Sequence, residues 1–233
     1  MNPANTDYVV LIPSRNRYEM LLRAVRSALA QTVQPIEVVV IDDASTDRRY
    51  DWVEEIVNSP RLTMLRQAVP SQEATGAGFA VGHVRNAGLD YVRHIKFDGW
   101  IHFLDDDDEW FPTKAETQLA AARRYDEVWA FSSNALNRGV DGQICGYHHG
   151  PHGRELSSGY RDVTQCLREF NPVVNSTGIV HTHVANKIGG QTPSGFGEDW
   201  DYWKRVAKLT PVVRIDEPLA YYTVGNQKEY AIE

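Results

Sequence analysis

Cysteine is scarce in this sequence of 233 residues, which contains only Cys145 and Cys166. Their spacing forms neither a CxxC motif nor a set of metal ligands, which argues against a cysteine-held zinc site and a thiol redox motif. So few cysteines fit a reducing compartment. The sequence also contains no internal repeat and no low-complexity segment, which argues against repeat architectures and disordered tails.

Positive charge and long apolar runs are lacking as well. Lysine and arginine total 24 against 31 acidic residues, a formal net charge of −7, whereas a general nucleic-acid-binding protein needs a basic face. No stretch approaches 18 apolar residues, so we expect no transmembrane segment. The amino terminus, MNPANTDYVV, has neither the basic start nor the apolar run of a signal peptide. We therefore expect a soluble, cytoplasmic protein that does not bind nucleic acid.

What the sequence does contain is an alternation of two hydrophobic periods, clearest in its first half. Short continuous apolar runs are typical of strands buried on both faces, and apolar residues three or four apart are typical of helices. We expect strands over 8–12, 36–41, 62–65, 100–104, 128–132, 178–183 and 212–215. We expect helices over 18–31, 47–58, 85–93, 112–125 and 200–209. Segment 134–155 is expected to be a loop or small hairpin, and 225–233 a loosely held tail.

Strands that alternate with helices indicate crossover connections and a mainly parallel sheet. Polar clusters follow three of the strands: 13–17, 42–47 and the run Asp105-Asp106-Asp107-Asp108-Glu109. Because the ends of parallel strands emerge at one edge of a sheet, where ligands bind, we expect these clusters to converge on one site.

The aspartate run needs an explanation in terms of charge. Two unit charges about 4 Å apart repel by roughly 1 kcal/mol in water and roughly 4 kcal/mol at a protein surface. Carboxylates are hard ligands suited to Mg²⁺ or Mn²⁺. A divalent cation between the aspartates and a nucleoside diphosphate would explain both the acidic run and how an acidic protein binds an anion.

Simpler interpretations remain open for these clusters. Segment 42–47 is also a good turn and helix cap, and the aspartate run could be a solvated loop before a helix. An EF-hand is excluded, because Trp110 stands where its loop requires glycine and a strand precedes the run.

Five segments carry a resemblance to a known family. In chain order they are VVLIPSRNRYEMLLRAVRSALAQT, IEVVVIDDASTD, VRNAGL, FLDDDDEWFPTK and GEDWDYWKRVA, spanning about 8–209. The sequence resembles a family 2 glycosyltransferase of the GT-A fold, inverting and metal-dependent. The resemblance implies an α/β, Rossmann-like single domain, 1–233, with a central mixed, mainly parallel sheet flanked by helices. About 1–110 would bind the nucleotide-sugar and about 111–224 the acceptor, with 225–233 as a tail.

The resemblance also assigns residues. It places the nucleotide-sugar against Pro13, Ser14, Arg15, Asp42, Asp43, Arg85, Asp105 and Asp106. It makes Asp107 the direct ligand of Mn²⁺ or Mg²⁺, with Asp105 nearer the ribose or a metal-bound water and a late histidine, His181 or His183, as an added ligand. Asp106 replaces the small residue usual between the two aspartates, so the four aspartates could share these roles differently.

GEDWDYW matches the segment with the catalytic base, which makes Asp199 the expected base and Glu198 the alternative. Asp199 could instead serve only as a helix cap, although one carboxylate can both cap a helix and accept a proton. Trp110 and Trp200 could stack on an acceptor sugar or simply pack in the core. His148, His149 and His152, in the irregular segment, could also supply such an added metal ligand or serve only a structural role.

Three functions are weighed on these grounds. The first is inverting transfer of a sugar, with a UDP-sugar as the expected donor, to a hydroxyl of a carbohydrate-containing acceptor. The second is a nucleotidyltransferase that makes a nucleotide-sugar, but the segment after the first strand, PSRNRYE, lacks the glycines of its phosphate loop. The third is a non-catalytic binding domain derived from a transferase. The sugar, the base and the acceptor are not specified by the sequence.

Overall fold

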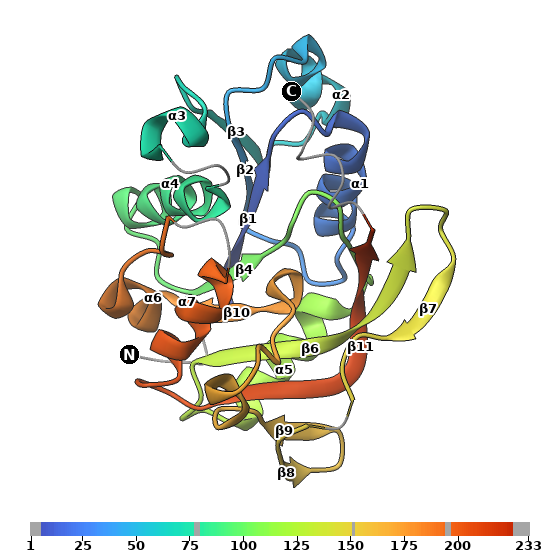
Figure 1. Cartoon of the computed structure of the whole chain (residues 1–233), viewed down its shortest axis with the longest axis vertical. Helices are drawn as coiled ribbons and strands as arrows, with labels where there is room; N and C mark the ends of the chain where they lie inside the picture. The colour runs from blue at the N-terminus through green and yellow to red at the C-terminus, as the bar shows by residue number, and fades with distance from the viewer. Residues whose placement is uncertain (1–5, 77–79, 151, 194–196, 226–233) are drawn as a thin grey trace.

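The amino-terminal strands form the parallel part of one large sheet (Figure 1). The computed structural model describes residues 6–76, 80–150, 152–193 and 197–225. The strands are β1 (Tyr8–Ser14), β2 (Glu37–Asp42), β3 (Leu62–Arg66) and β4 (Trp100–Phe103). All pair in parallel, with β1 between β2 and β4, as expected for continuous apolar runs buried on both faces.

The second half of the chain extends the same sheet with strands in both directions. Its order is β3-β2-β1-β4-β10-β6-β11-β9-β8, and β5 and β7 pair with β11 and β6 outside this path. The short β10 lies antiparallel between β4 and β6, and β11 runs parallel to β6. The bounds are β5 (Glu109–Trp110), β6 (Ala130–Gly139), β7 (Ile144–Tyr147), β8 (Arg154–Ser157), β9 (Tyr160–Asp162), β10 (Ile179–His181) and β11 (Val212–Val224).

Helices cover both faces of the sheet. Alternate side chains of β1 enter two different cores: Tyr8, Val10 and Ile12 pack with α1, α2 and α5, while Val9 and Leu11 pack with α4, α6 and α7. The α-helices are α1 (Tyr18–Leu29), α2 (Val53–Val57), α3 (Ser71–Thr75), α4 (Val81–His94), α5 (Lys114–Arg124), α6 (Thr182–Ile188) and α7 (Glu198–Val206). Short 3₁₀ turns cover Arg48–Trp52, Cys166–Arg168 and Asn175–Thr177.

The expected fold class, an α/β mixed sheet flanked by helices, is confirmed. Several element boundaries were wrong. The strand expected over 178–183 ends at His181 and continues as α6, so His183 lies on a helix. Segment 134–155, expected as a loop or hairpin, does contain a hairpin, in which the end of β6 pairs antiparallel with β7. The strand expected over 212–215 runs on to Val224, with register shifts on either side of Pro218.

The expected convergence of the strand ends is confirmed. Ser14 at the end of β1 is the register partner of Asp42 at the end of β2, and the backbone N–H of Leu104 after β4 donates to Leu11 O at 3.1 Å. Pro13, also in β1, is buried beside Ile41. All three polar clusters therefore begin at one edge of the sheet.

A search of the described residues for a helix long and apolar enough to cross a membrane found none. The tail expected over 225–233 lies outside the described residues except for Gly225.

Candidate active site

The four aspartates after β4 point to different partners, and two of them share one arginine. Nη1 of Arg17 lies 3.1 Å from Asp106 Oδ1 and 2.9 Å from Asp107 Oδ2. Ser14 donates a hydrogen bond to Asp106 Oδ2 at 2.7 Å. Burial raises the pKa of Asp106 to about 7, and the Arg17 guanidinium opposes this shift. Arg17 thus offsets the repulsion between Asp106 and Asp107, a role that the sequence analysis gave to a divalent cation.

Asp108 has a structural environment. It is buried, accepts hydrogen bonds from the Ser176 hydroxyl and, at 2.7 Å, from the backbone N–H of Thr223 in β11. Burial raises its pKa well above the ordinary value. Ser176 Oγ also accepts from the backbone N–H of Asp105 at 3.0 Å. Asp108 and Ser176 therefore fix the aspartate loop to the second half of the sheet.

Arg85 connects the aspartate loop to the start of α7. This α4 residue is buried, and its Nη2 lies 2.6 Å from Asp105 Oδ1 while its Nη1 lies 3.0 Å from Glu198 Oε1. The guanidinium supplies two separate ion pairs in a fixed fork, which a lysine cannot do. The pair of carboxylates raises the pKa of Arg85 although burial opposes it, so its charge is permanent.

Asp199, next to Glu198, has a different environment. Asn171 Nδ2 donates to its Oδ2 at 3.0 Å, and the backbone N–H of Trp200 donates to its Oδ1 at 2.7 Å. Among the described residues no arginine or lysine forms an ion pair with it, whereas Glu198 is paired with Arg85. Burial raises the pKa of Asp199, Arg85 opposes the shift and Glu198 adds to it. A half-buried, oriented carboxylate of raised pKa suits proton transfer.

Asp199 and the aspartate run face a common region. The hydroxyl of Tyr222 in β11 has its pKa raised to about 12, first by burial and then by the negative charges of Asp108, Asp105, Asp107 and Asp199. The same group of residues surrounds Arg85, whose charge is stabilised by Asp105, Glu198 and Asp199. The expected catalytic segment and the aspartate run therefore belong to one site.

The acidic pair after β2 stabilises local structure. Asp42 Oδ1 accepts the backbone N–H of Ser45 at 2.9 Å, which closes a turn. Asp43 accepts the backbone N–H and the hydroxyl of Ser71 at 2.6 and 2.7 Å and lies 3.5 Å from Arg15 Nη1. The turn interpretation therefore holds for Asp42. A contact of Asp43 and Arg15 with a nucleotide stays a prediction.

Neither histidine expected as an added metal ligand lies beside the aspartates. His181 is the register partner of Trp100, at the start of β4, and its ring packs between Trp100 and Trp129. Five residues of extended chain separate Trp100 from Asp105, a span of roughly 15 Å. His183, on α6, contacts Lys187 at 2.9 Å. Both assignments were wrong. The sequence does not reveal whether a histidine in a strand lies at the edge of the sheet that carries the aspartates or at the opposite edge.

Of the two interpretations left open for the tryptophans near the acidic motifs, packing fits Trp110. Trp110 is buried, donates from Nε1 to Ser176 O at 2.6 Å and lies beneath the Lys114 ammonium, so packing accounts for it. Trp200 is half-buried and donates to Leu167 O at 2.8 Å.

The donor set fits a cation held jointly with a ligand. No three His, Cys, Asp or Glu side chains in the described part of the chain are grouped so that they could hold a metal ion by themselves. Mg²⁺, however, is commonly held by one or two carboxylates together with substrate phosphates. Among the four aspartates, Asp107 and Asp105 are the most exposed, with 19% and 25% of their side chains accessible. These two residues can therefore bind a cation together with the diphosphate of a ligand.

Sequence reasoning missed several residues of the site. Arg17 follows the same strand as Arg15, and nothing in the sequence shows which of the two reaches the aspartates. Asn171, Ser176 and Tyr222 come from the irregular second half, where no motif marks them. Their roles depend on pairings made by β10 and β11, which a single sequence does not reveal.

Comparisons with known proteins bear on the family of this chain. A model of glycosyl transferase family 2 matches residues 9–144. WfaP of Escherichia coli, a UDP-Glc:alpha-D-GlcNAc-diphosphoundecaprenol beta-1,3-glucosyltransferase, is 31% identical over 110 residues, which are 47% of this chain and 39% of WfaP. An uncharacterized glycosyltransferase of Haemophilus influenzae is 28% identical over 239 residues, 94% of this chain and 69% of that protein.

The fold is also that of a solved structure. The crystal structure of S. aureus TarS 1–349 in complex with UDP superposes with a TM-score of 0.70 at 21% identity, covering 94% of this chain and 61% of that one. Because the family model spans more than half of the sequence, from the first strand past the aspartate run, the chain belongs to glycosyl transferase family 2.

Proposed function

We propose that this chain transfers a sugar from a nucleotide-diphosphate sugar to a hydroxyl of a glycan or glycoconjugate, with inversion at the anomeric carbon. The observation that carries the proposal is the buried Arg85, which joins Asp105 of the aspartate run to Glu198 beside Asp199. This arrangement brings a diphosphate-binding motif and an unpaired, oriented carboxylate to one edge of the sheet. Acceptor activation and donor binding need to be adjacent in this way.

Asp199 is the proposed general base. The acceptor hydroxyl oxygen forms a bond to the anomeric carbon as the bond from that carbon to the diphosphate oxygen breaks. The electron pair of the broken bond leaves with the diphosphate, and the hydroxyl proton passes to Asp199. Asn171 and the backbone N–H of Trp200 hold the carboxylate in place, which fixes its direction toward the acceptor.

Asp107 and Asp105 would hold Mn²⁺ or Mg²⁺. When bound, the cation supplies a positive charge that stabilises the departing diphosphate. Arg17 keeps Asp107 in place through the 2.9 Å contact, and Arg85 does the same for Asp105. Both aspartates are therefore oriented by arginines before any ligand binds.

A UDP-sugar is the proposed donor. The name of WfaP states a UDP-Glc donor for that protein, and TarS was crystallised with UDP. WfaP acts on a lipid-linked saccharide according to its name, and a carbohydrate-containing acceptor is proposed here on that ground. The choice of sugar is left to experiment.

Donor binding can be tested by thermal shift. We expect UDP with MnCl₂ to raise Tm, EDTA to abolish the rise, and GDP or dTDP to give a smaller one. Ligand at about 100 times its Kd stabilises by about 2.7 kcal/mol, a shift easily measured. Asp107→Asn should lose the rise, whereas Asp126→Asn, at an exposed position after α5, should keep it. An undiminished shift in EDTA would contradict the proposed metal.

The two alternatives predict different outcomes. A non-catalytic binding domain would give the thermal shift but release no UDP from UDP-sugars in the presence of acceptor or water. A nucleotidyltransferase would produce pyrophosphate from UTP and a sugar phosphate. No observation in the structure favours either alternative over sugar transfer.

A further inference from the structure

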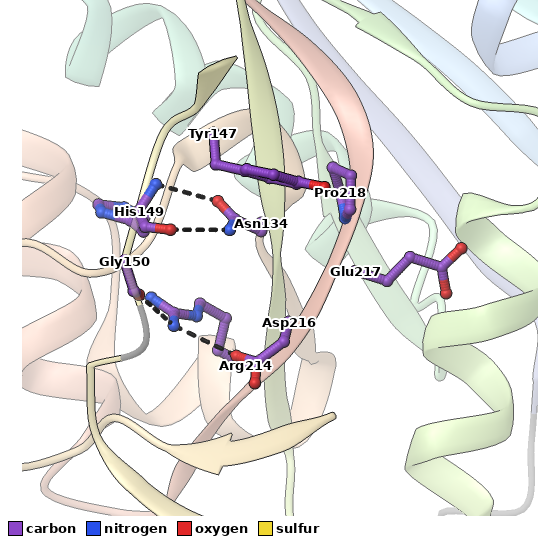
Figure 2. A pocket seen from close by; sticks show the side chains of 8 residues that line it. All are labelled: Asn134, Tyr147, His149, Gly150, Arg214, Asp216, Glu217 and Pro218. Carbon is purple, nitrogen blue, oxygen red and sulfur yellow. Dashed lines mark hydrogen bonds and ion pairs between the residues drawn. The ribbon is translucent and has the colours of Figure 1, made fainter. Parts of the chain in front are cut away.

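A cavity lies away from the aspartate run, between β6, β11 and the residues that follow β7 (Figure 2). Its volume of about 490 Å³ falls in the range of small-molecule sites. Its lining residues are Asn134, Tyr147, His149, Gly150, Arg214, Asp216, Glu217 and Pro218. The mechanism proposed above uses none of them.

An arginine lies at the floor of this cavity with part of its hydrogen-bonding capacity unused. Arg214 is fully buried, and its Nη2 donates to Gly150 O at 2.8 Å and lies 3.3 Å from Asp216 Oδ1. Its Nε and Nη1 are buried and have no hydrogen-bond partner among the residues that the structure describes. Leaving N–H groups of a buried guanidinium without acceptors costs free energy. A ligand that accepted these hydrogen bonds would recover that free energy.

Asp216 compensates the charge of Arg214 only in part. Asp216 is shared, because its Oδ2 also accepts from Arg161 Nε at 2.8 Å, and Arg161 in turn lies 3.8 Å from Glu155. Glu217 also lines the cavity (Figure 2), but it forms no ion pair with Arg214 among the described residues. His149 is neutral at physiological pH, since burial lowers its pKa to about 3, and its Nε2 has no partner among the described residues. One partly compensated cation thus faces the cavity.

The mouth of the cavity is apolar. Tyr147 is 65% exposed, and Figure 2 shows its side chain lying across the top of the cavity toward Pro218. Its ring offers a flat face to the C–H side of a sugar ring. The cavity thus has an apolar platform at one end and a guanidinium at the other.

Stacked side chains connect the wall of this cavity to the active site. The His149 ring contacts His148 at 4.5 Å between centroids, and His148 contacts Tyr222 at the same distance. The pKa of Tyr222 is raised first by burial and then by the charges of Asp108, Asp105, Asp107 and Asp199. His149, in the wall of the cavity, is therefore two ring contacts away from Tyr222.

We propose that the cavity is an acceptor subsite for a sugar unit that carries a carboxylate, with its ring against Tyr147 and its carboxylate on Arg214. The role as an acceptor subsite rests on the proposed sugar transfer, whereas binding of the carboxylate-bearing sugar itself does not depend on it. A single guanidinium already shared with Asp216 matches a monoanion better than a doubly charged phosphate monoester. The carboxylate would supply acceptors for the two unpaired nitrogen atoms.

A matched pair of probes tests this site directly. Methyl β-D-glucuronide and methyl β-D-glucoside differ in the carboxylate alone, and saturation-transfer NMR detects millimolar binding of either. We expect a signal from the glucuronide at least fivefold that from the glucoside, weakened by 0.5 M NaCl. Equal signals, no signal, or a stronger response to glucose 6-phosphate would overturn the assignment.

Two variants locate the binding. Tyr147→Ala removes an exposed side chain and should abolish the glucuronide signal without affecting the fold, and Arg214→Met should remove the preference for the carboxylate. Ile144→Ala, at an exposed position on the same hairpin outside the cavity, is the matched control and should keep the signal. Persistence of the preference in both test variants would exclude the cavity as the site.

The UDP thermal shift separates this proposal from the proposed function. Tyr147→Ala should keep the full shift with UDP and MnCl₂. If wild-type protein binds UDP but not the glucuronide, the subsite is wrong and sugar transfer stands. If it binds the glucuronide but not UDP, the nucleotide-sugar assignment fails instead.

Discussion

At the scale of single residues, Glu198 and Asp199 show how neighbours in sequence acquire different chemistry. Glu198 is neutralised by Arg85 at 3.0 Å, whereas the hydrogen-bond donors to Asp199 among the described residues are neutral, namely Asn171 and a backbone N–H. A paired carboxylate is a poor base because its ion pair must be broken before it accepts a proton. The geometry therefore favours Asp199 over Glu198 as the base.

Replacing Asp199 with asparagine should abolish most of the activity. General-base catalysis contributes about 10²- to 10⁴-fold, and we expect kcat to fall within that range while the UDP thermal shift persists. The measurement is UDP release from the preferred UDP-sugar. Asp201→Asn is the control, since Asp201 lies on the same helix and pairs with Arg205 at 2.9 Å. Wild-type turnover in Asp199→Asn would remove this residue from the mechanism.

The pH profile gives a second test at this residue. A base works when deprotonated, and burial raises the pKa of Asp199 above its ordinary value of 3.8. We therefore expect log(kcat/KM) to rise with pH up to that raised pKa and then level off. Glu198→Gln removes a negative charge that contributes to the shift, so it should move the acidic limb to lower pH. An unmoved or raised limb would contradict the electrostatic account.

At the scale of elements, the site depends on α4 holding the aspartate loop and α7 in a fixed relation through Arg85. The sequence predicted these helices well, because each has a clear apolar face. It predicted β10 as a strand that is too long, and it did not predict the full length of β6 and β11. The second half of β6, NALNRG, has no hydrophobic alternation, and its pairing with β11 decides its structure. Strands of this kind are determined by tertiary contacts.

Replacing Arg85 with lysine tests the connection between the two helices. A lysine keeps the charge but reaches only one carboxylate well, so either Asp105 or Glu198 is left buried without its partner. We expect a loss of about 2–4 kcal/mol in the free energy of unfolding, measured with urea, and a marked loss of turnover. Arg93→Lys, on the same helix with a partly exposed side chain, should change stability by less than about 0.5 kcal/mol. Equal effects of the two substitutions would refute the bridging role.

At the scale of the whole molecule, the formal charge of −7 says little about where charges lie. The acidic loop is offset locally by Arg17 and Arg85, a balance that composition cannot show. The core contains an ionisable side chain that the sequence gave no reason to expect there. Lys114, the first residue of α5, is fully buried with its Nζ 3.2 Å from His102 Nδ1 and 3.8 Å from the centre of the Trp110 ring.

This buried lysine makes stability depend on pH. Burial lowers the pKa of Lys114 well below 10.5, and burial and Lys114 together lower that of His102. Between the depressed folded pKa and 10.5, the unfolded chain binds a proton that the folded chain does not. Stability therefore rises with pH in that window, by up to about 1.4 kcal/mol per pH unit for each such group.

Lys114→Met should raise stability and flatten this pH dependence. Methionine fills a similar volume without a charge to desolvate, and replacing a buried charge in this way is neutral or stabilising by about 1–4 kcal/mol. We expect the gain to be larger at pH 6 than at pH 9. The buried lysine lowers the stability of the wild-type protein most at the pH where Lys114 is fully protonated in the unfolded chain. Urea unfolding at both pH values measures it, with Lys208→Met at an exposed position as control. A destabilised Lys114→Met with an unchanged pH slope would show that the lysine is charged and paired in the folded protein.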